Sequence, residues 1–256
     1  MDNILVMDVG NTNTAVGVFQ GERLAHHWRV TTAKDRTADE MGILIKTLFQ
    51  DQGLKSERVN GVVVSSVVPP MVSVIEDMCK LYFRCAPLIV GPGIKTGLLV
   101  KYENPRDVGA DRVANAVAAV HRFGCPVIVV DVRTATTFTV VNQEGHYIGG
   151  VIAPGVKSSA NALFQQTAKL PSIDLAAPRN VIGKNTVSSM QSGIVYGFAG
   201  LIDHLVERIC QEVPAPYRVV ATGHYARLIS PHSSVITDVV PHLTLEGLRI
   251  LWDLNR

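Results

Sequence analysis

The stretch Asp8-Val9-Gly10-Asn11-Thr12-Asn13-Thr14 decides the fold, because its pattern returns in the second half of the chain. It ends the apolar run from Ile4, which predicts a buried strand followed by a hydroxyl-rich turn. Val6-Met7-Asp8-Val9 matches Val129-Val130-Asp131-Val132 at an offset of 123 residues, from 8 to 131, and at this offset Thr14 falls on Thr137. Each half continues as strand, turn, strand and helices, which favours an internal duplication.

Apolar periodicity predicts the other elements of both halves. The expected strands are 4–9, 15–19, 24–30, 61–68, 88–90, 126–131, 138–141, 147–152 and 218–222, and the expected helices are 39–50, 71–83, 105–123, 157–168, 186–213 and 244–254. We expect two domains, 1–122 and 123–256. The last helix can stay in the second domain or pack back on the first.

The first loop can be interpreted in two ways. An aspartate at the end of a buried strand, such as Asp8, is costly unless it is hydrogen-bonded, paired or near a cation. Gly10 allows a tight turn and a close approach of phosphate to the backbone amides, and Asn11 to Thr14 offer further donors. Taken alone, the same residues could instead form an Asx-type hairpin turn with Asp8 as a local cap.

The second loop favours phosphate binding. Asp131 ends the corresponding strand, and Thr134, Thr136 and Thr137 follow with hydroxyls. Two such loops facing each other across a cleft would hold a triphosphate and its Mg²⁺ from both sides. This is the arrangement of the actin-like ATPases. The sequence therefore predicts an α/β fold of two ribonuclease-H-like (actin-like) lobes, each a mixed five-stranded sheet with helices, and a nucleotide cleft between them.

A third aspartate, Asp111, lies next to Arg112 after Gly109, where the chain becomes helical. Asp111 and Arg112 could be a surface ion pair or a helix cap of little energetic consequence. Alternatively, Asp111 accepts a proton and Arg112 anchors an anionic substrate. Kinase aspartates orient the acceptor hydroxyl and take its proton late. Thr186, at the start of the long helix 186–213, is similarly either an N-cap or a substrate contact.

Several motifs, taken in order along nearly the whole chain, resemble type III pantothenate kinase. The more specific ones are Gly91-Pro92-Gly93-Ile94-Lys95-Thr96-Gly97 and Gly109-Ala110-Asp111-Arg112. The others are Asp8 to Thr12, Ser65 to Pro69, Asn104-Pro105, Thr134 to Thr137, Gly149-Gly150, Pro154-Gly155 and Gly183 to Thr186. The resemblance implies ATP-dependent phosphorylation of pantothenate to 4′-phosphopantothenate, the first step toward coenzyme A, by a homodimer.

The resemblance also implies roles for individual residues. Asp111 would be the catalytic proton acceptor for the pantothenate hydroxyl. Asp131 would bind a monovalent cation, K⁺ or NH₄⁺, and Asp8 would meet Mg²⁺ through water. The implied ATP contacts are Asp8, Val9, Gly10, Asn11, Thr12, Asn13, Thr14, Ala15 and Thr134. The implied substrate contacts are Tyr102, Gly109, Ala110, Asp111, Arg112 and Thr186.

Arg133 departs from the family pattern, in which a glycine is expected so close to phosphate. If the backbone there needs a positive φ, a non-glycine residue would be strained. The side chain could also crowd the nucleotide, or it could point at phosphate and stabilise charge. Arg133 therefore favours one alternative, a catalytically impaired, kinase-like accessory or regulatory protein. A kinase for another small hydroxy acid or sugar is a second alternative, because the segment from Tyr102 to Arg112 indicates pantothenate only through the resemblance.

Composition and charge exclude some classes of function. The chain has 256 residues, 18% of them charged, with a formal net charge of +2. It lacks the basic stripe typical of nucleic-acid binders and an apolar run long enough to cross a membrane. The four cysteines form no CxxC pair, so we interpret them as thiols in a reducing cytosol. We therefore expect a cytoplasmic protein that binds neither nucleic acid nor membranes.

Overall fold

The computed structural model describes residues 3–256, which form two compact units. Unit 1 comprises the chain up to Gly97 together with Glu103–Ala118 and Leu243–Arg256, and unit 2 comprises Leu98–Tyr102 and Ala119–His242. The final helix thus belongs to the unit that begins the chain. No helix among residues 3–256 has the length and apolar character needed to cross a membrane.

Unit 1 contains a five-stranded sheet in the order β3-β2-β1-β4-β5. The first three strands are antiparallel neighbours, whereas β4 and β5 run parallel to β1. The strands are β1 (Asn3–Val9), β2 (Asn13–Gln20), β3 (Arg23–Thr31), β4 (Val59–Ser66) and β5 (Leu88–Ile89). The helices are α1 (Ala38–Asp51), α2 (Pro69–Met78), a π-helical turn (Cys79–Phe83), α7 (Leu243–Asn255) and the short 3-10 turns Ser56–Arg58 and Pro105–Asp107. Helix α3 (Ala110–Phe123) starts in unit 1 and continues into unit 2.

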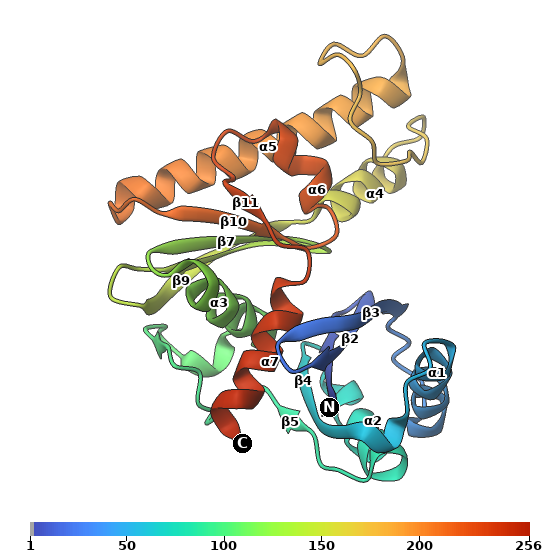
Figure 1. The fold of residues 1–256 in the computed structure, drawn as a ribbon. Coiled ribbons are helices and arrows are strands. Elements are labelled where there is room, and N and C mark those ends of the chain that lie inside the picture. Colours follow the sequence, from blue (N-terminus) through green and yellow to red (C-terminus); the bar gives the residue numbers. More distant parts are fainter. Residues whose placement is uncertain (1–2) are drawn as a thin grey trace. The chain divides into compact units, whose positions relative to one another are not determined.

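Helices cover both faces of the unit 1 sheet (Figure 1). Leu5 and Met7 of β1 share a buried cluster with residues of α1 and α2. On the opposite face, α7 packs against β1, β2 and β4. Gly61 of β4 makes room for the Trp252 ring, since a Cβ there would come within 2.2 Å of it. This close fit explains why the last helix belongs to unit 1.

Unit 2 contains a six-stranded sheet in the order β11-β10-β7-β8-β9-β6. The strands are β6 (Leu99–Val100), β7 (Val127–Val132), β8 (Ala135–Val141), β9 (His146–Pro154), β10 (Arg218–Thr222) and β11 (Asp238–Val239). The helices are α4 (Val156–Gln166), α5 (Thr186–Glu212), α6 (Ala226–Ile229) and the 3-10 turn Ser230–His232. Residues of α4 and α5 pack on one sheet face, around Phe138 and Phe198. The sixth strand, β6, was not expected, because two residues are too few to show periodicity.

The two sheets repeat one topology. The order β3-β2-β1-β4-β5 in unit 1 returns as β9-β8-β7-β10-β11 in unit 2. The strand pairing corrects one detail of the expected repeat. Val9 pairs with Thr14, and Val132 pairs with Thr136, so Thr14 corresponds to Thr136 and not to Thr137. The turn after β7 is one residue shorter than the turn after β1. A comparison of the two halves at the constant offset of 123 residues cannot detect this difference.

Candidate active site

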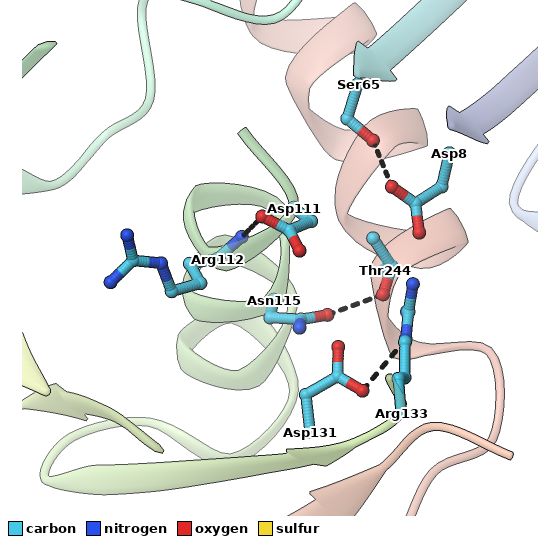
Figure 2. A network of polar contacts seen from close by, with 8 residues as sticks. All are labelled: Asp8, Ser65, Asp111, Arg112, Asn115, Asp131, Arg133 and Thr244. Carbon is cyan, nitrogen blue, oxygen red and sulfur yellow. Dashed lines mark hydrogen bonds and ion pairs between the residues drawn. The ribbon is translucent and has the colours of Figure 1, made fainter. Parts of the chain in front are cut away.

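The first predicted phosphate loop connects β1 to β2, and its aspartate is held by the neighbouring strand. Asp8 is buried, and Ser65, its register partner on β4, donates a hydrogen bond to Asp8 Oδ1 at 2.6 Å (Figure 2). Ser65 belongs to a motif of the sequence resemblance, but its contact with Asp8 was not predicted. A hydrogen-bond donor of this kind stabilises the ionised form of a buried carboxylate.

The loop itself exposes only part of its predicted ligand contacts. Gly10 N–H donates to the carbonyl of Asn13 and closes the turn, and Asn11 and Thr12 are exposed at its tip. Asn13 and Ala15 are half-buried, and the side chain of Val9 lies in the core. The Thr14 hydroxyl is buried 2.8 Å from that of Thr32. The tip therefore offers amides and polar side chains to an anion, whereas Val9 and Thr14 contribute to packing.

The predicted proton acceptor lies in the first turn of α3. Asp111 Oδ1 accepts the N–H of Arg112 at 2.9 Å, and a Cβ on Gly109 would lie 2.6 Å from the same oxygen. Arg112 is half-buried and donates through Nη2 to the carbonyl of Asp107 at 3.3 Å. Gly109 and Ala110 are half-buried beside them. The segment 109–112 is thus one ordered unit, in which a helix N-terminus favours the negative charge of Asp111.

A buried polar contact that the sequence did not reveal joins α3 to α7. The Thr244 hydroxyl donates to Asn115 Oδ1 at 2.7 Å, and both residues are almost fully buried (Figure 2). Nearby, a Cβ on Gly247 would come within 2.0 Å of the Ala114 carbonyl, so the two helices lie in close contact. Asn115 is one helical turn from Asp111. The C-terminal helix therefore fixes the helix that carries this aspartate.

The second predicted phosphate loop connects β7 to β8 in unit 2. Asp131 is buried, and Arg133 Nε donates to Asp131 Oδ1 at 2.8 Å (Figure 2). Arg133 does not have a positive φ; among residues 3–256 only Arg84 does so without being glycine. The concern about backbone strain at position 133 was therefore wrong. The Arg133 guanidinium pairs with Asp131, the aspartate of its own loop.

The backbone of this second loop is braced by neighbouring segments. The carbonyl of Thr134 accepts hydrogen bonds from Gly155 N–H at 3.1 Å and from the Ser158 hydroxyl at 2.8 Å. A Cβ on Gly155 would lie 2.2 Å from the Arg133 carbonyl, which explains a glycine at the start of α4. Thr134 itself is exposed and can reach a ligand.

The two remaining predicted substrate residues lie in unit 2. Tyr102 follows β6, and its ring packs edge-on against Tyr147 with centroids 6.3 Å apart. Thr186 is the first residue of α5, but the N-cap is Asn185, whose side chain accepts the Ser188 N–H. The capping interpretation of Thr186 was therefore wrong. Thr186 is exposed and lines a surface pocket of about 620 Å³ with Lys184 and Asn185.

The structure thus divides the predicted site between the units. Asp8 to Ala15 and Gly109 to Arg112 belong to unit 1, and Tyr102, Asp131, Thr134 and Thr186 belong to unit 2. Among residues 3–256, no group of three or more His, Cys, Asp or Glu side chains could hold a metal ion alone. A single carboxylate such as Asp8 suits Mg²⁺ that keeps several waters and binds nucleotide phosphates.

Comparison with known proteins identifies the family and the fold. A family model described as type III pantothenate kinase matches residues 4–208. The fold is similar to an activator of 2-hydroxyisocaproyl-CoA dehydratase from Clostridium difficile, with 13% identity over 98% of this chain and 94% of that one and a TM-score of 0.58. Component A of (R)-2-hydroxyglutaryl-CoA dehydratase from Acidaminococcus fermentans gives 12% identity, coverages of 97% and 95%, and a TM-score of 0.59. An inorganic polyphosphate/ATP-glucomannokinase from Arthrobacter sp. strain KM has 13% sequence identity over 98% of this chain and 98% of that one, with a TM-score of 0.52. At such identities these likenesses show the two-lobed actin-like fold alone.

Proposed function

Because the chain belongs to the type III pantothenate kinase family, we propose that it transfers the γ-phosphoryl group of ATP to the hydroxyl of pantothenate, giving ADP and 4′-phosphopantothenate. This would be the first step toward coenzyme A. Units 1 and 2 would be the two lobes of the kinase, each with one phosphate loop. The family and the fold support a kinase, and pantothenate as the acceptor is the finer part of the proposal.

The observation that carries the proposal is the ordered segment at the start of α3. Asp111 Oδ1 is held by the backbone N–H of Arg112, so its carboxylate is positioned before any substrate arrives. Asp111 would orient the pantothenate hydroxyl and accept its proton late in the transfer. Arg112 would anchor the pantothenate carboxylate, and Tyr102, Gly109, Ala110 and Thr186 would line the rest of the pocket.

The nucleotide would be held mainly by the backbone and short polar side chains. Asn11 and Thr12 at the loop tip, together with Gly10, Asn13 and Ala15, would contact the phosphates, and exposed Thr134 would add a hydroxyl from the second loop. Asp8 would hold Mg²⁺ through water, and this ion neutralises phosphate charge when bound. Ser65 keeps the Asp8 carboxylate oriented for that contact.

The test is a coupled ADP-release assay of the purified protein with Mg²⁺-ATP and a panel of acceptors. We expect ADP release with pantothenate and not with short hydroxy acids or glucose, and a product with the mass of 4′-phosphopantothenate. Release with another acceptor but not with pantothenate would reassign the substrate. Binding of ATP and pantothenate without turnover would favour the accessory protein that Arg133 first suggested.

We also propose a cytoplasmic homodimer. Its support is a set of exposed apolar residues before and at the start of α5: Val181, Ile182 and Val187 have 65%, 82% and 42% of their surface exposed. Such a group is unusual on a monomer and is typical of an interface. Light scattering coupled to size exclusion should give twice the chain mass of 27.7 kDa. Ile182→Glu should shift this value toward the monomer, whereas Ile43→Glu, at an exposed position of α1, should not.

A further inference from the structure

The aspartate of the second loop already has a cation within the chain. The side chain of Asp131 has only 5% of its surface exposed, and a buried carboxylate is costly without a compensating charge. Arg133 Nε lies 2.8 Å from Asp131 Oδ1, and its side chain is 27% exposed. This distance is that of a charge-assisted hydrogen bond. The compensating charge at Asp131 is therefore part of the same loop.

Asp131 Oδ1 is also enclosed by backbone. Gly223, directly after β10, has a φ of +88°, and a Cβ built there would lie 2.5 Å from Asp131 Oδ1 and 2.6 Å from the Val132 carbonyl. The same carboxylate oxygen thus has the Gly223 backbone on one side and the Arg133 guanidinium as its hydrogen-bond donor. A metal ion that used Asp131 Oδ1 as a ligand would lie beside the Arg133 guanidinium, whose positive charge opposes it.

We propose that the Arg133 guanidinium takes the place of a monovalent metal or ammonium ion at Asp131, so that this protein does not depend on K⁺ or NH₄⁺. The residues present thus do not fit the cation that the family resemblance implied. A second positive charge beside the guanidinium would be repelled, and the tethered guanidinium needs no binding from solution. The inference deepens the proposed kinase function, and it rests on that function for assigning this loop to phosphate.

Thr222 gives the inference a second consequence. It is the register partner of Asp131 on β10, and its fully buried hydroxyl has no hydrogen-bond partner. If Arg133 were removed, the Asp131 carboxylate and the Thr222 hydroxyl would be available as oxygen ligands on the same face of the sheet. Removing Arg133 should therefore create a response to K⁺ that the natural chain lacks.

Thermal unfolding in KCl, NH₄Cl and NaCl at equal ionic strength tests the inference. We expect one melting temperature for the natural chain in all three salts. Arg133→Gly should melt lower in NaCl and regain roughly 5 °C in saturating KCl or NH₄Cl. The double variant Arg133→Gly/Thr222→Val should lose most of that gain. Kinase turnover of the natural chain should likewise be equal in the three salts.

Two further variants serve as controls for the melting experiment. Arg133→Gln, which removes the charge and keeps a shorter polar side chain, replaces the glycine variant if that one does not fold. Arg218→Gln removes another ion pair of unit 2, with Asp238, and should give no difference between K⁺ and Na⁺. A saturable, K⁺-specific rise for the natural chain would overturn the inference, as would Arg133 variants that melt identically in all salts. Melting requires no turnover, so failure to release ADP from any acceptor would overturn the proposed kinase activity alone.

Discussion

The two predicted phosphate loops occupy equivalent places in sheets of the same strand order, but they stabilise their aspartates differently. Asp8 accepts a hydrogen bond from Ser65 on the neighbouring strand, a neutral donor that does not cancel its charge. At the position equivalent to Ser65, the Thr222 hydroxyl makes no hydrogen bond, and Asp131 pairs with Arg133 instead. The two units thus keep the same strand order, while Arg133 changes the electrostatics of the loop in unit 2. Asp8 in unit 1 therefore suits a cation bound from solution, whereas Asp131 in unit 2 is already paired with the positive charge of Arg133.

The largest effect on turnover should come from unit 1. Asp111→Asn removes the proposed proton acceptor but keeps an oxygen that can accept the Arg112 N–H, so kcat should fall by roughly 10²–10⁴-fold without loss of folding. Steady-state ADP release and circular dichroism measure the two properties. Asp107→Asn, an exposed carboxylate four residues earlier, is the matched control and should stay close to the natural rate. Near-normal turnover of Asp111→Asn would reject its assignment as the base.

The largest effect on stability should come from unit 2. Asp131→Asn leaves the partly buried Arg133 guanidinium without its carboxylate, which should cost about 2–4 kcal/mol in the free energy of unfolding. Asp8→Asn retains an acceptor for Ser65 and should cost less stability while lowering turnover more. Urea unfolding of both variants checks the contrast. Equal losses of stability would show that Arg133 contributes no more to its aspartate than Ser65 does.

The equivalent hydroxyls Ser65 and Thr222 give a sharper contrast. Ser65→Ala removes a donor from a buried carboxylate and should cost about 1–2 kcal/mol. Thr222→Val replaces a buried hydroxyl without a hydrogen-bond partner by a methyl group, and should be neutral within about 0.5 kcal/mol or stabilising. Both are measured by chemical denaturation at neutral pH. A marked loss for Thr222→Val would mean that this hydroxyl has a bound partner in solution.

The smallest effect concerns the ion pair between Arg218 and Asp238 in unit 2. Arg218 donates to both oxygens of Asp238, at 2.6 and 3.0 Å, and this hydrogen bonding lowers the pKa of Asp238 below its ordinary value of 3.8. The stabilisation is therefore present above that ordinary value and is lost as the pH falls through the lowered pKa. Asp238→Asn should lower the melting temperature by only about 1–3 °C at pH 7.

Melting curves of the Asp238→Asn variant and the natural chain from pH 7 down to acid should converge. A difference that persists in acid would show that the loss is not electrostatic. Because the Arg218 side chain is 51% exposed, this pair gives a reference for how much the burial of Asp131 adds.

The periodicity of apolar residues predicted most of the longer helices and strands. The end of β1 at Val9, the whole of β10 and the start of α5 at Thr186 lie where apolar periodicity placed them. Several strand boundaries moved by two or three residues, as for β4 and β8, and two helix starts moved at prolines. Helix α2 begins at Pro69, since proline fits the first turn of a helix, and α3 begins at Ala110 after a separate 3-10 turn at Pro105–Asp107. The short strands β6 and β11 exist only because a neighbouring strand pairs with them.

The sequence by itself determined the repeat, the α/β class, the two aspartate-tipped loops and the resemblance that identifies the family, because strand periodicity and short motifs are local properties of the chain. Only the tertiary structure decided which side chains meet. It paired Ser65 with Asp8 and Thr244 with Asn115 across 57 and 129 residues of chain, and it turned Arg133 onto Asp131. It also packed α7 on the first sheet. The physical reason is that these contacts depend on sheet register and helix packing, which no stretch of sequence encodes alone.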